Sequence, residues 1–175
     1  MEFLTGDPSL RASAMEALGV LSGMSLWVSN RAVDMEMFQF GQRHEGTDKR
    51  GQPTRWGDYA LHVQCPWRIV DPDHIIVGYQ DVYRSLTGVH LEGLEWDVQG
   101  GNLRDRRLTE LFDRSGMGPL VVEAVEVDAA GTIHMALGRG IALEVFPDAS
   151  AANGEEEQWR FFMVDSESDH FVVSA

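Results

Sequence analysis

The stretch YALHVQCPWRIVDPDHIIV, residues 59–77, recurs in altered form near the end of the chain. Residues 141–173 read IALEVFP, then an eleven-residue insertion, and then WRFFMVDSESDHFVV. Three groups of residues match: Ala60-Leu61-x-Val63 with Ala142-Leu143-x-Val145, Trp67-Arg68 with Trp159-Arg160, and Asp73-His74-Ile75-Ile76-Val77 with Asp169-His170-Phe171-Val172-Val173. Upstream, residues 35–41 can be aligned with residues 132–138. The chain is therefore predicted to contain two copies of one β unit.

Side-chain alternation predicts that both copies consist of short antiparallel strands. Residues 59–65 alternate between large apolar side chains and smaller or polar ones, the period of a strand with one face on a core. Asp71-Pro72-Asp73-His74 has the residues favoured in a type I turn, which predicts a hairpin. An earlier hairpin is predicted over residues 25–40, with its turn at Ser29-Asn30-Arg31. The second copy is expected to place strands at residues 121–128, 132–137, 141–145, 159–164 and 171–174.

Residues 80–118 separate the copies and differ from them in pattern. Asn102 is a favoured N-cap residue and predicts a helix through Phe112, ended by Gly116 and Gly118-Pro119. Its predicted apolar stripe contains Leu103, Leu108, Leu111 and Phe112. Its predicted polar face contains Arg104, Arg106, Arg107, Glu110 and Asp113. A second short helix is expected to begin at Pro8, with Asp7 as its N-cap.

These patterns predict an α+β fold that is mainly β. Two pseudo-repeated antiparallel units would pack as a sandwich or partly closed barrel, with about two short helices, because packing the copies together hides sheet edges. The 175 residues fit a single domain, with 43% hydrophobic and 24% charged residues, as is usual for a globular protein. Its expected parts are a first β repeat at 23–79, a connector with a helix at 80–118 and a second β repeat at 119–175.

The sequence favours a cytoplasmic protein. Cys65 is the single cysteine and cannot close a disulfide within the chain, which suits a reducing compartment. The first twenty residues lack the basic start and long apolar run of a secretory signal, and no stretch has the length needed to cross a bilayer. Export and membrane association are therefore not predicted, and nothing in the sequence selects an oligomeric state.

Charge is distributed unevenly between the copies. Residues 1–118 hold 12 Lys and Arg against 17 Asp and Glu, a net charge of −5, whereas residues 119–175 hold 2 against 11, a net charge of −9. An acidic field repels nucleic acid and attracts a basic protein, so a basic protein partner is expected and nucleic acid is not. Solubility alone is the alternative explanation of the acidity.

The copies also differ in the position of their long loop, and these loops carry opposite charge. Loops on a repeated scaffold are where repeats diverge in use, so the loops supply the candidate binding residues. In the first copy, the loop at residues 42–57 supplies Arg43, Arg50, Arg55 and Trp56. In the second copy, the loop at residues 148–158 supplies Glu155, Glu156 and Glu157. The acidic loop could instead fold back on the arginines and neutralise them.

No catalytic or metal-binding signature is present. Asp73-His74 and Asp169-His170, each with an acidic residue two positions earlier, could offer oxygen and imidazole ligands, but each pair supplies too few by itself. Cys65 precedes a proline in an apolar strand, where a thiol is usually inert packing. Residues 100–102 are better explained as a capped turn than as a phosphate site. No metal, cofactor or catalytic residue is predicted. The sequence favours a protein that is not an enzyme without deciding the matter.

Residues 60–68 (ALHVQCPWR), 96–102 (WDVQGGN) and the ending from Trp159 carry a resemblance to a group of small uncharacterised bacterial proteins. The ending also resembles the strand pattern of small domains associated with bacterial toxin-immunity loci. Neither resemblance implies catalytic residues. The leading hypothesis is therefore a non-enzymatic cytoplasmic binding protein, of an immunity or regulatory kind, whose acidic second half meets a basic partner. The alternative is an enzyme or small-ligand binder with a cleft between the repeats, with the Asp-His turns or the loop at residues 43–56 at its mouth.

Overall fold

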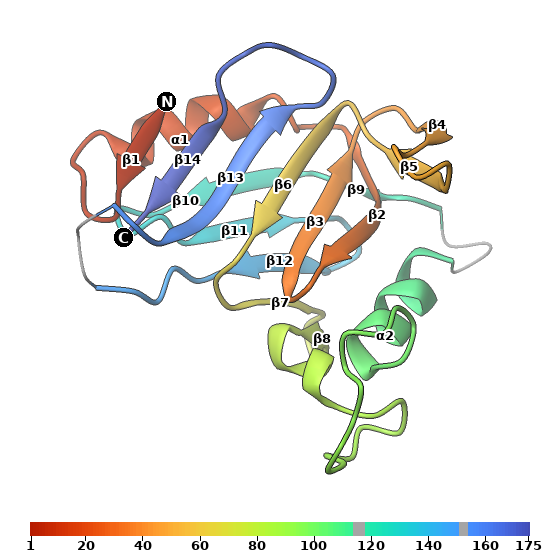
Figure 1. Ribbon diagram of the computed structural model, residues 1–175. Helices are drawn as coiled ribbons and strands as arrows, with labels where there is room; N and C mark the ends of the chain where they lie inside the picture. Colours follow the sequence, from red (N-terminus) through yellow and green to blue (C-terminus); the bar gives the residue numbers. More distant parts are fainter. Residues whose placement is uncertain (114–117, 151–153) are drawn as a thin grey trace.

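The computed structural model describes residues 1–113, 118–150 and 154–175. These residues form a mainly β fold in which two sheets share one core, with a two-stranded arm at one side and helices at the margins (Figure 1). The strands are β1 (Glu2–Leu4), β2 (Ser25–Ala32), β3 (Met35–Phe40), β4 (His44–Thr47), β5 (Pro53–Trp56), β6 (Tyr59–Val63), β7 (Trp67–Val70), β8 (Ile75–Gly78), β9 (Leu120–Val121), β10 (Ala124–Val127), β11 (Ile133–Ala136), β12 (Ala142–Val145), β13 (Glu157–Met163) and β14 (Phe171–Ser174). The helices are α1 (Leu10–Gly19), the 3-10 helix η1 (Tyr79–Tyr83) and α2 (Leu103–Phe112).

The front sheet has the strand order β1-β14-β13-β6-β3-β2-β9, and the back sheet has the order β10-β11-β12-β7-β8. Strands β4 and β5 pair only with each other among the described strands and form the arm. The predicted mainly β α+β fold is confirmed, and the sheets in the described ranges do not close into a barrel. No helix in these ranges is both long enough and apolar enough to cross a membrane.

The two predicted copies contribute strands to both sheets. In the first copy, β2, β3 and β6 lie in the front sheet, and the chain then crosses at Pro66 so that β7 and β8 join the back sheet. In the second copy, β10, β11 and β12 lie in the back sheet, and β13 and β14 join the front sheet. Each sheet is therefore built from three strands of one copy and two of the other, flanked in the front sheet by β1 and β9.

The register places matched residues at equivalent positions. Trp159 lies opposite Val63 between β13 and β6, and Trp67 lies opposite Val145 between β7 and β12. Both indole side chains are buried, with Trp67 2% and Trp159 0% exposed. Val63 and Val145 are themselves aligned in the sequence, so each matched tryptophan lies opposite the matched valine of the other segment.

The turn of the β2–β3 hairpin was predicted at Ser29-Asn30-Arg31, and this prediction was wrong. Strand β2 continues through Ala32, and Ala32 pairs with Met35 across a two-residue turn in which Val33 has a φ of 58°. A positive φ is unfavourable for a β-branched residue, and this turn is held from outside. Arg104 of α2 donates to the Asp34 carbonyl with both terminal nitrogens at 3.1 Å, and Arg31 Nη1 donates to the Val33 carbonyl at 2.6 Å. Tertiary contacts therefore override the local preference of the three polar residues for a turn.

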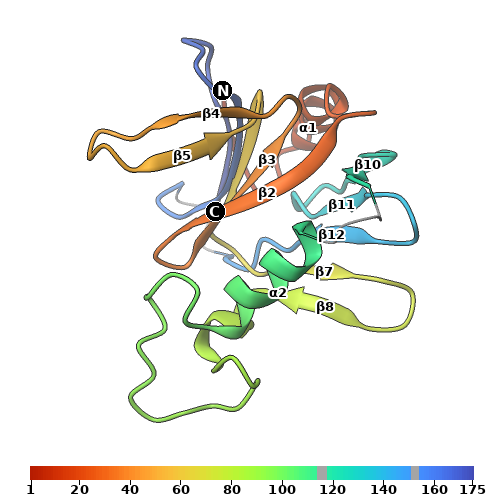
Figure 2. The same cartoon turned by 90° about the vertical axis from the view of Figure 1, so that its right-hand side faces the viewer.

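Helix α2 begins and ends where the sequence predicted. The side chain of Asn102 accepts a hydrogen bond from the Asp105 amide at 2.9 Å, which confirms the N-cap. The prediction that Arg104 lies on a polar face was wrong, because Arg104 is fully buried. The predicted stop at Gly116 lies outside the described residues. Helix α2 contacts β2, β8 and η1, so it spans the side of the molecule where one edge of each sheet ends (Figure 2).

Three further elements differ from the predictions. Helix α1 begins at Leu10, with Ser9 at its N-cap, two residues after the predicted start. The strand predicted over residues 121–128 is divided between β9 in the front sheet and β10 in the back sheet. Strand β1 was not predicted, because three residues are too few to show an alternation of side chains. It pairs in parallel with β14.

Candidate functional site

The site lies along β2 beyond the end of β9. Strand β9 pairs with β2 only at Ser25 and Leu26, so the rest of β2 forms an edge of the front sheet. Helix α2 lies on one side of this edge, and the arm formed by β4 and β5 lies on the other (Figure 2). The arm contacts β2 directly, since Asn30 Nδ2 donates a hydrogen bond to the Arg55 carbonyl at 3.3 Å. The edge is thus walled by two elements far apart in sequence.

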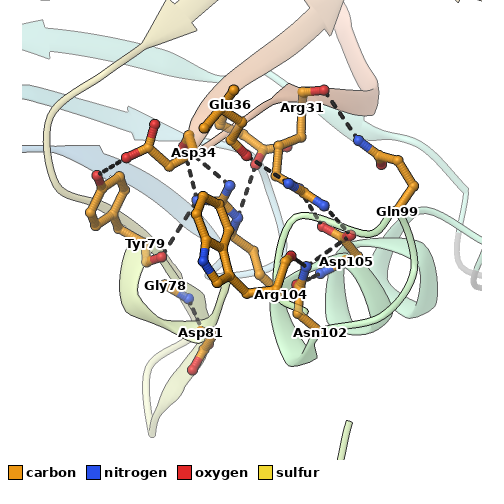
Figure 3. A network of polar contacts seen from close by, with 12 residues as sticks. Arg31, Asp34, Glu36, Gly78, Tyr79, Asp81, Gln99, Asn102, Arg104 and Asp105 are labelled. Atoms are coloured by element: carbon orange, nitrogen blue, oxygen red, sulfur yellow. Dashed lines mark hydrogen bonds and ion pairs between the residues drawn. The ribbon is translucent and has the colours of Figure 1, made fainter. Parts of the chain in front are cut away.

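Arg31 joins β2 to α2. Its guanidinium group makes a bidentate contact with the Asp105 carboxylate, with Nε–Oδ1 and Nη2–Oδ2 distances of 3.0 and 2.9 Å (Figure 3). Asn102 also donates to Asp105, at 3.0 Å, and Gln99 Nε2 donates to the Arg31 carbonyl at 3.3 Å. The Arg31 side chain is only 3% exposed. A bidentate pair of this kind fixes both partners, so α2 is held in a defined position against the strand.

Arg104 makes a second, deeper ion pair beside the first. Its Nε lies 3.3 Å from Glu36 Oε2, and the two side chains are 0% and 2% exposed. Its terminal nitrogens donate to the Asp34 carbonyl, both at 3.1 Å, and its guanidinium carbon lies 5.7 Å from the centre of the Trp67 ring. Arg104 therefore ties α2 to the β2–β3 turn and to the core (Figure 3).

Burial controls the ionisation of this cluster. It raises the pKa of Glu36 to about 7, although the positive charge of Arg104 acts in the opposite direction. Burial also lowers the pKa of Arg104 from its ordinary value. The pKa of Tyr79 is raised, by burial and by the hydrogen bond of its hydroxyl group to Asp34 at 2.9 Å. Glu36 is thus a buried carboxyl group that titrates near neutral pH.

The cluster of Arg31, Glu36, Arg104 and Asp105 is called the charged floor. A groove of about 840 Å³ lies next to it. Its sides are β2, the arm and α2, and it also borders Gln99 and Gly100 of the connector. Its lining includes Ser29 and Arg31 on β2, Arg55 on the arm, Arg43 before it, and Leu108 and Phe112 on α2. The volume lies in the usual range of binding pockets, about 300–1,000 Å³.

One buried polar atom next to the groove lacks a partner. Trp27 Nε1 has no hydrogen-bond partner in the described part of the chain, whereas Glu36 Oε2 pairs with Arg104 and the Glu36 carboxyl group also interacts with the Ser29 hydroxyl group. Unpaired buried polar groups are uncommon in stable proteins. Arg43 lies over the Trp27 ring, with its guanidinium carbon 5.1 Å from the ring centre. The groove therefore combines charge with an aromatic surface.

The basic residues predicted from the first loop occupy different places. Arg43 and Arg55 border the groove, and both lie within ion-pair distance of Glu45, at 3.0 and 3.5 Å. Arg50 lies in the turn between β4 and β5. Trp56 ends β5, and its Nε1 donates to Asp165 Oδ2 at 2.8 Å, which ties the arm to the β13–β14 turn. Two of the four predicted residues thus reach the groove.

The acidic residues predicted from the second loop lie elsewhere. Glu155 and Glu156 are exposed, and Glu157 begins β13. Glu157 forms an ion pair with Arg160 and accepts a hydrogen bond from Gln64 at 2.9 Å. They lie across the front sheet from the arm (Figure 1). Among the described residues, no ion pair joins them to Arg43 or Arg55, whose acidic partner is Glu45.

The structure separates the two Asp-His turns. His74 lies in the β7–β8 turn of the back sheet, with Nδ1 2.9 Å from Asp71 Oδ1. His170 precedes β14 in the front sheet and stacks on Phe162 at a ring distance of 4.2 Å. Across residues 1–113, 118–150 and 154–175, no three His, Cys, Asp or Glu side chains come together in a way that could hold a metal ion. Cys65 is buried, and burial raises its pKa to about 12.

Sequence reasoning missed the charged floor formed by Arg31, Glu36, Arg104 and Asp105. One signal was available, because the alignment of residues 35–41 with 132–138 places Glu36 opposite Ile133. Ile133 is fully buried, so Glu36 is a charge at a core position of the predicted repeat.

Comparison of the chain with protein-family models, with curated proteins and with solved structures gave no match.

Proposed function

We propose that this chain is a non-enzymatic protein-binding domain whose contact site is the groove between the arm and α2. One observation carries the proposal: an open edge of β2 lies at the base of a groove of about 840 Å³, between the basic side chains of Arg43 and Arg55 and the apolar side chains of Leu108 and Phe112. Protein interfaces combine an apolar centre with a polar rim in this way.

The charged groups beside the groove favour binding over catalysis. Arg31 is committed to Asp105, and Arg104 to Glu36. Both pairs are largely closed to solvent, so they serve to hold β2 and α2 in a fixed relation. A general acid or base must instead be within reach of a substrate proton. A rigid surface that needs little reorganisation is an advantage for a docking site.

The proposed partner is a basic protein. The chain has a net charge of −14, and a field of that sign raises the rate at which a basic protein is encountered. An immunity or regulatory protein of the cytoplasm that occupies a basic target would have this chemistry. The acidic residues provide long-range attraction, and the groove provides the specific contact.

Site-specific photo-crosslinking in the cell of origin tests the proposal. A photoreactive amino acid would replace Thr54 at the groove, Glu156 at the acidic end or Glu126 on the back sheet. We expect position 54 to crosslink to a discrete basic protein that positions 156 and 126 do not capture. Crosslinking from position 156 but not from position 54 would place the contact at the acidic end and contradict the groove.

Charge reversal on the arm supplies a matched comparison. Arg55→Glu changes a residue that borders the groove, whereas Arg50→Glu makes the same change in the turn of the arm. We expect Arg55→Glu to weaken the crosslink at position 54 and Arg50→Glu to leave it. Equal effects of both substitutions would show that the arm contributes general charge and no specific contact.

A further inference from the structure

The backbone of β2 presents unused hydrogen-bonding groups to the groove. In an antiparallel pair, successive residues direct their N–H and C=O groups alternately towards the partner strand and away from it. The Arg31 carbonyl accepts its bond from Gln99, which lies outside the sheet, so the backbone of Arg31 points away from β3. By alternation, the N–H and C=O groups of Ser29 also point away from β3.

The irregularity in β2 agrees with this assignment. Leu26 directs its backbone towards β9, since Met24, two residues earlier, accepts a bond from the Val122 amide next to that strand. Regular alternation from Leu26 would turn Val28 outwards. The register shifts between Leu26 and Val28, however, and a bulge of one residue moves the outward set to Ser29 and Arg31. Within the described ranges, the backbone N–H and C=O groups of Ser29 take part in no hydrogen bond outside the sheet ladder.

The groove leaves room for a strand at this edge. It borders β2 from Trp27 to Arg31, and α2 and the arm stand on its two sides. Neighbouring strands of a sheet lie about 4.7–4.9 Å apart, so an added strand would occupy the space directly beside β2. Edges of this kind are usually protected, because they can pair with any exposed strand. Here α2 and the arm cover the two sides of the β2 edge, and the groove between them leaves the edge accessible.

From this geometry, which rests on the proposed function, we propose that the partner is recognised through an extended segment that adds to the front sheet as a strand beside β2. The backbone of Ser29 and the N–H group of Arg31 would pair with the segment. Its side chains would alternate between the two walls, because successive residues of a strand point to opposite faces. Those facing α2 would meet Leu108 and Phe112, and those facing the arm would meet Arg43 and Arg55. The expected segment is therefore apolar at every second position and polar or acidic between.

The test uses random peptides displayed on phage, selected on the folded wild-type protein. Selected peptides are then synthesised and their affinity is measured by calorimetry for wild type, Ser29→Pro and Ser29→Ala. Proline at an outward-facing edge position removes the N–H group and keeps the ladder to β3, whereas alanine removes only the hydroxyl group. We expect selected peptides with the alternating pattern, at least about tenfold weaker binding to Ser29→Pro, and nearly unchanged binding to Ser29→Ala.

Backbone methylation of the peptide keeps the test decisive if Ser29→Pro fails to fold. Methylating one peptide amide at a time removes single N–H groups while the protein remains wild type. Strand addition predicts that methylation weakens binding at every second position and leaves the positions between nearly unaffected. An effect without this period overturns the proposal.

The remaining outcomes separate strand addition from the proposed function. Peptides that lose binding with Phe112→Ala but not with Ser29→Pro would leave the groove as a contact site and exclude strand addition. Failure to select any peptide that needs the β2 edge would also overturn the proposal, while crosslinking at position 54 would still decide the groove. Self-association that Ser29→Pro abolishes would assign the edge to a second copy of the chain instead.

Discussion

The guanidinium group of Arg104 is closed to solvent and depends entirely on its protein neighbours. A carboxylate of Glu36, the carbonyl of Asp34 and the ring of Trp67 surround it. Removing a charge from water costs several kcal/mol, and close partners must offset that cost. This single residue therefore couples the position of α2 to the strained turn at Val33 and to the ionisation of Glu36.

Replacing Arg104 should be far more damaging than replacing its neighbour on the same helix. Arg104→Met would leave Glu36 without its ion-pair partner and the Asp34 carbonyl without its donors, so we expect a loss of about 3–5 kcal/mol in the free energy of unfolding. Arg106→Met removes an exposed pair with Glu110, whose atoms are 3.4 Å apart, and should cost less than about 1 kcal/mol. Urea denaturation followed by circular dichroism measures both. Similar losses would contradict a structural role for the buried pair.

Glu36 should give the protein a distinctive pH dependence. Its pKa is about 7 in the folded protein against an ordinary value of 4.5, so between these pH values the folded state keeps a proton that the unfolded state has lost. The contribution of Glu36 to stability is therefore present below pH 4.5 and declines as the pH rises through 7, with a slope of at most about 1.4 kcal/mol per pH unit.

The comparison of wild type with Glu36→Gln isolates this effect, because other titrating groups are common to both proteins. The free energy of unfolding of wild type, relative to the variant, should fall between pH 5 and pH 7 and level off above pH 8. Denaturation curves that change in parallel over this range would mean that Glu36 is ionised throughout.

The contacts of this cluster were only partly predictable from the sequence. Helical spacing places Arg104 on the same face as Leu108, four positions later, and therefore within the apolar stripe. Charged residues are rarely buried, so it was predicted on the polar face. What the spacing could not show is its partner, because the Asp34 carbonyl lies 70 positions earlier in the chain. The alignment of Glu36 with Ile133 was the available sign that a charge had entered the core.

At the scale of elements, local signals predicted those elements whose stability is local. The N-cap of α2 and the β7–β8 turn use residues whose side chains bond to their own backbone, and both were found where expected. Residues 42–57 were expected to be a loop, but they form β4 and β5. The pairing of the arm depends on distant contacts, such as the bond from Trp56 to Asp165.

Gly57 determines how the arm leaves the front sheet. A Cβ atom at this position would lie 2.2 Å from the Phe40 carbonyl oxygen and 2.7 Å from its nitrogen, so no side chain fits without moving β3. We expect Gly57→Ala to cost about 3 kcal/mol and to increase hydrogen exchange in the arm. Gly19→Ala, with open space around it in α1, should be neutral or stabilising by up to about 1 kcal/mol. A stable Gly57→Ala protein with an unchanged arm would contradict the close packing.

At the scale of the molecule, the predicted repeat aligned residues of the two segments but did not indicate which sheet each strand joins. The burial pattern of a strand is the same whether the strand joins the sheet of its own segment or that of the other segment. The register decides the matter, because β6 pairs with β13 and β7 pairs with β12. The proposed site lies where the copies differ most, at the inserted arm and the connector. Loop charge pointed to Arg43 and Arg55, whereas the β2 edge emerged only from the sheet order.

The two matched tryptophans test how far this equivalence extends to energetics. Trp67 and Trp159 are both buried, so replacement of either by alanine should cost about 3–5 kcal/mol. They differ in their polar atom: Trp159 Nε1 donates to the Gly131 carbonyl at 2.9 Å, whereas Trp67 Nε1 has no hydrogen-bond partner among the residues that the structure describes. Trp159→Phe would leave that carbonyl unpaired, while Trp67→Phe removes a group that is already unpaired.

We therefore expect Trp159→Phe to lower the free energy of unfolding by about 1–2 kcal/mol more than Trp67→Phe. Circular dichroism in urea is the suitable measurement, since both substitutions alter tryptophan fluorescence. Equal losses for the two phenylalanine variants would show that the hydrogen bond to Gly131 adds nothing to packing. A loss below about 1 kcal/mol for either alanine variant would remove that residue from the core. We expect this difference because the matched positions give the two rings similar packing. The hydrogen bond of Trp159, in contrast, depends on a loop carbonyl, that of Gly131.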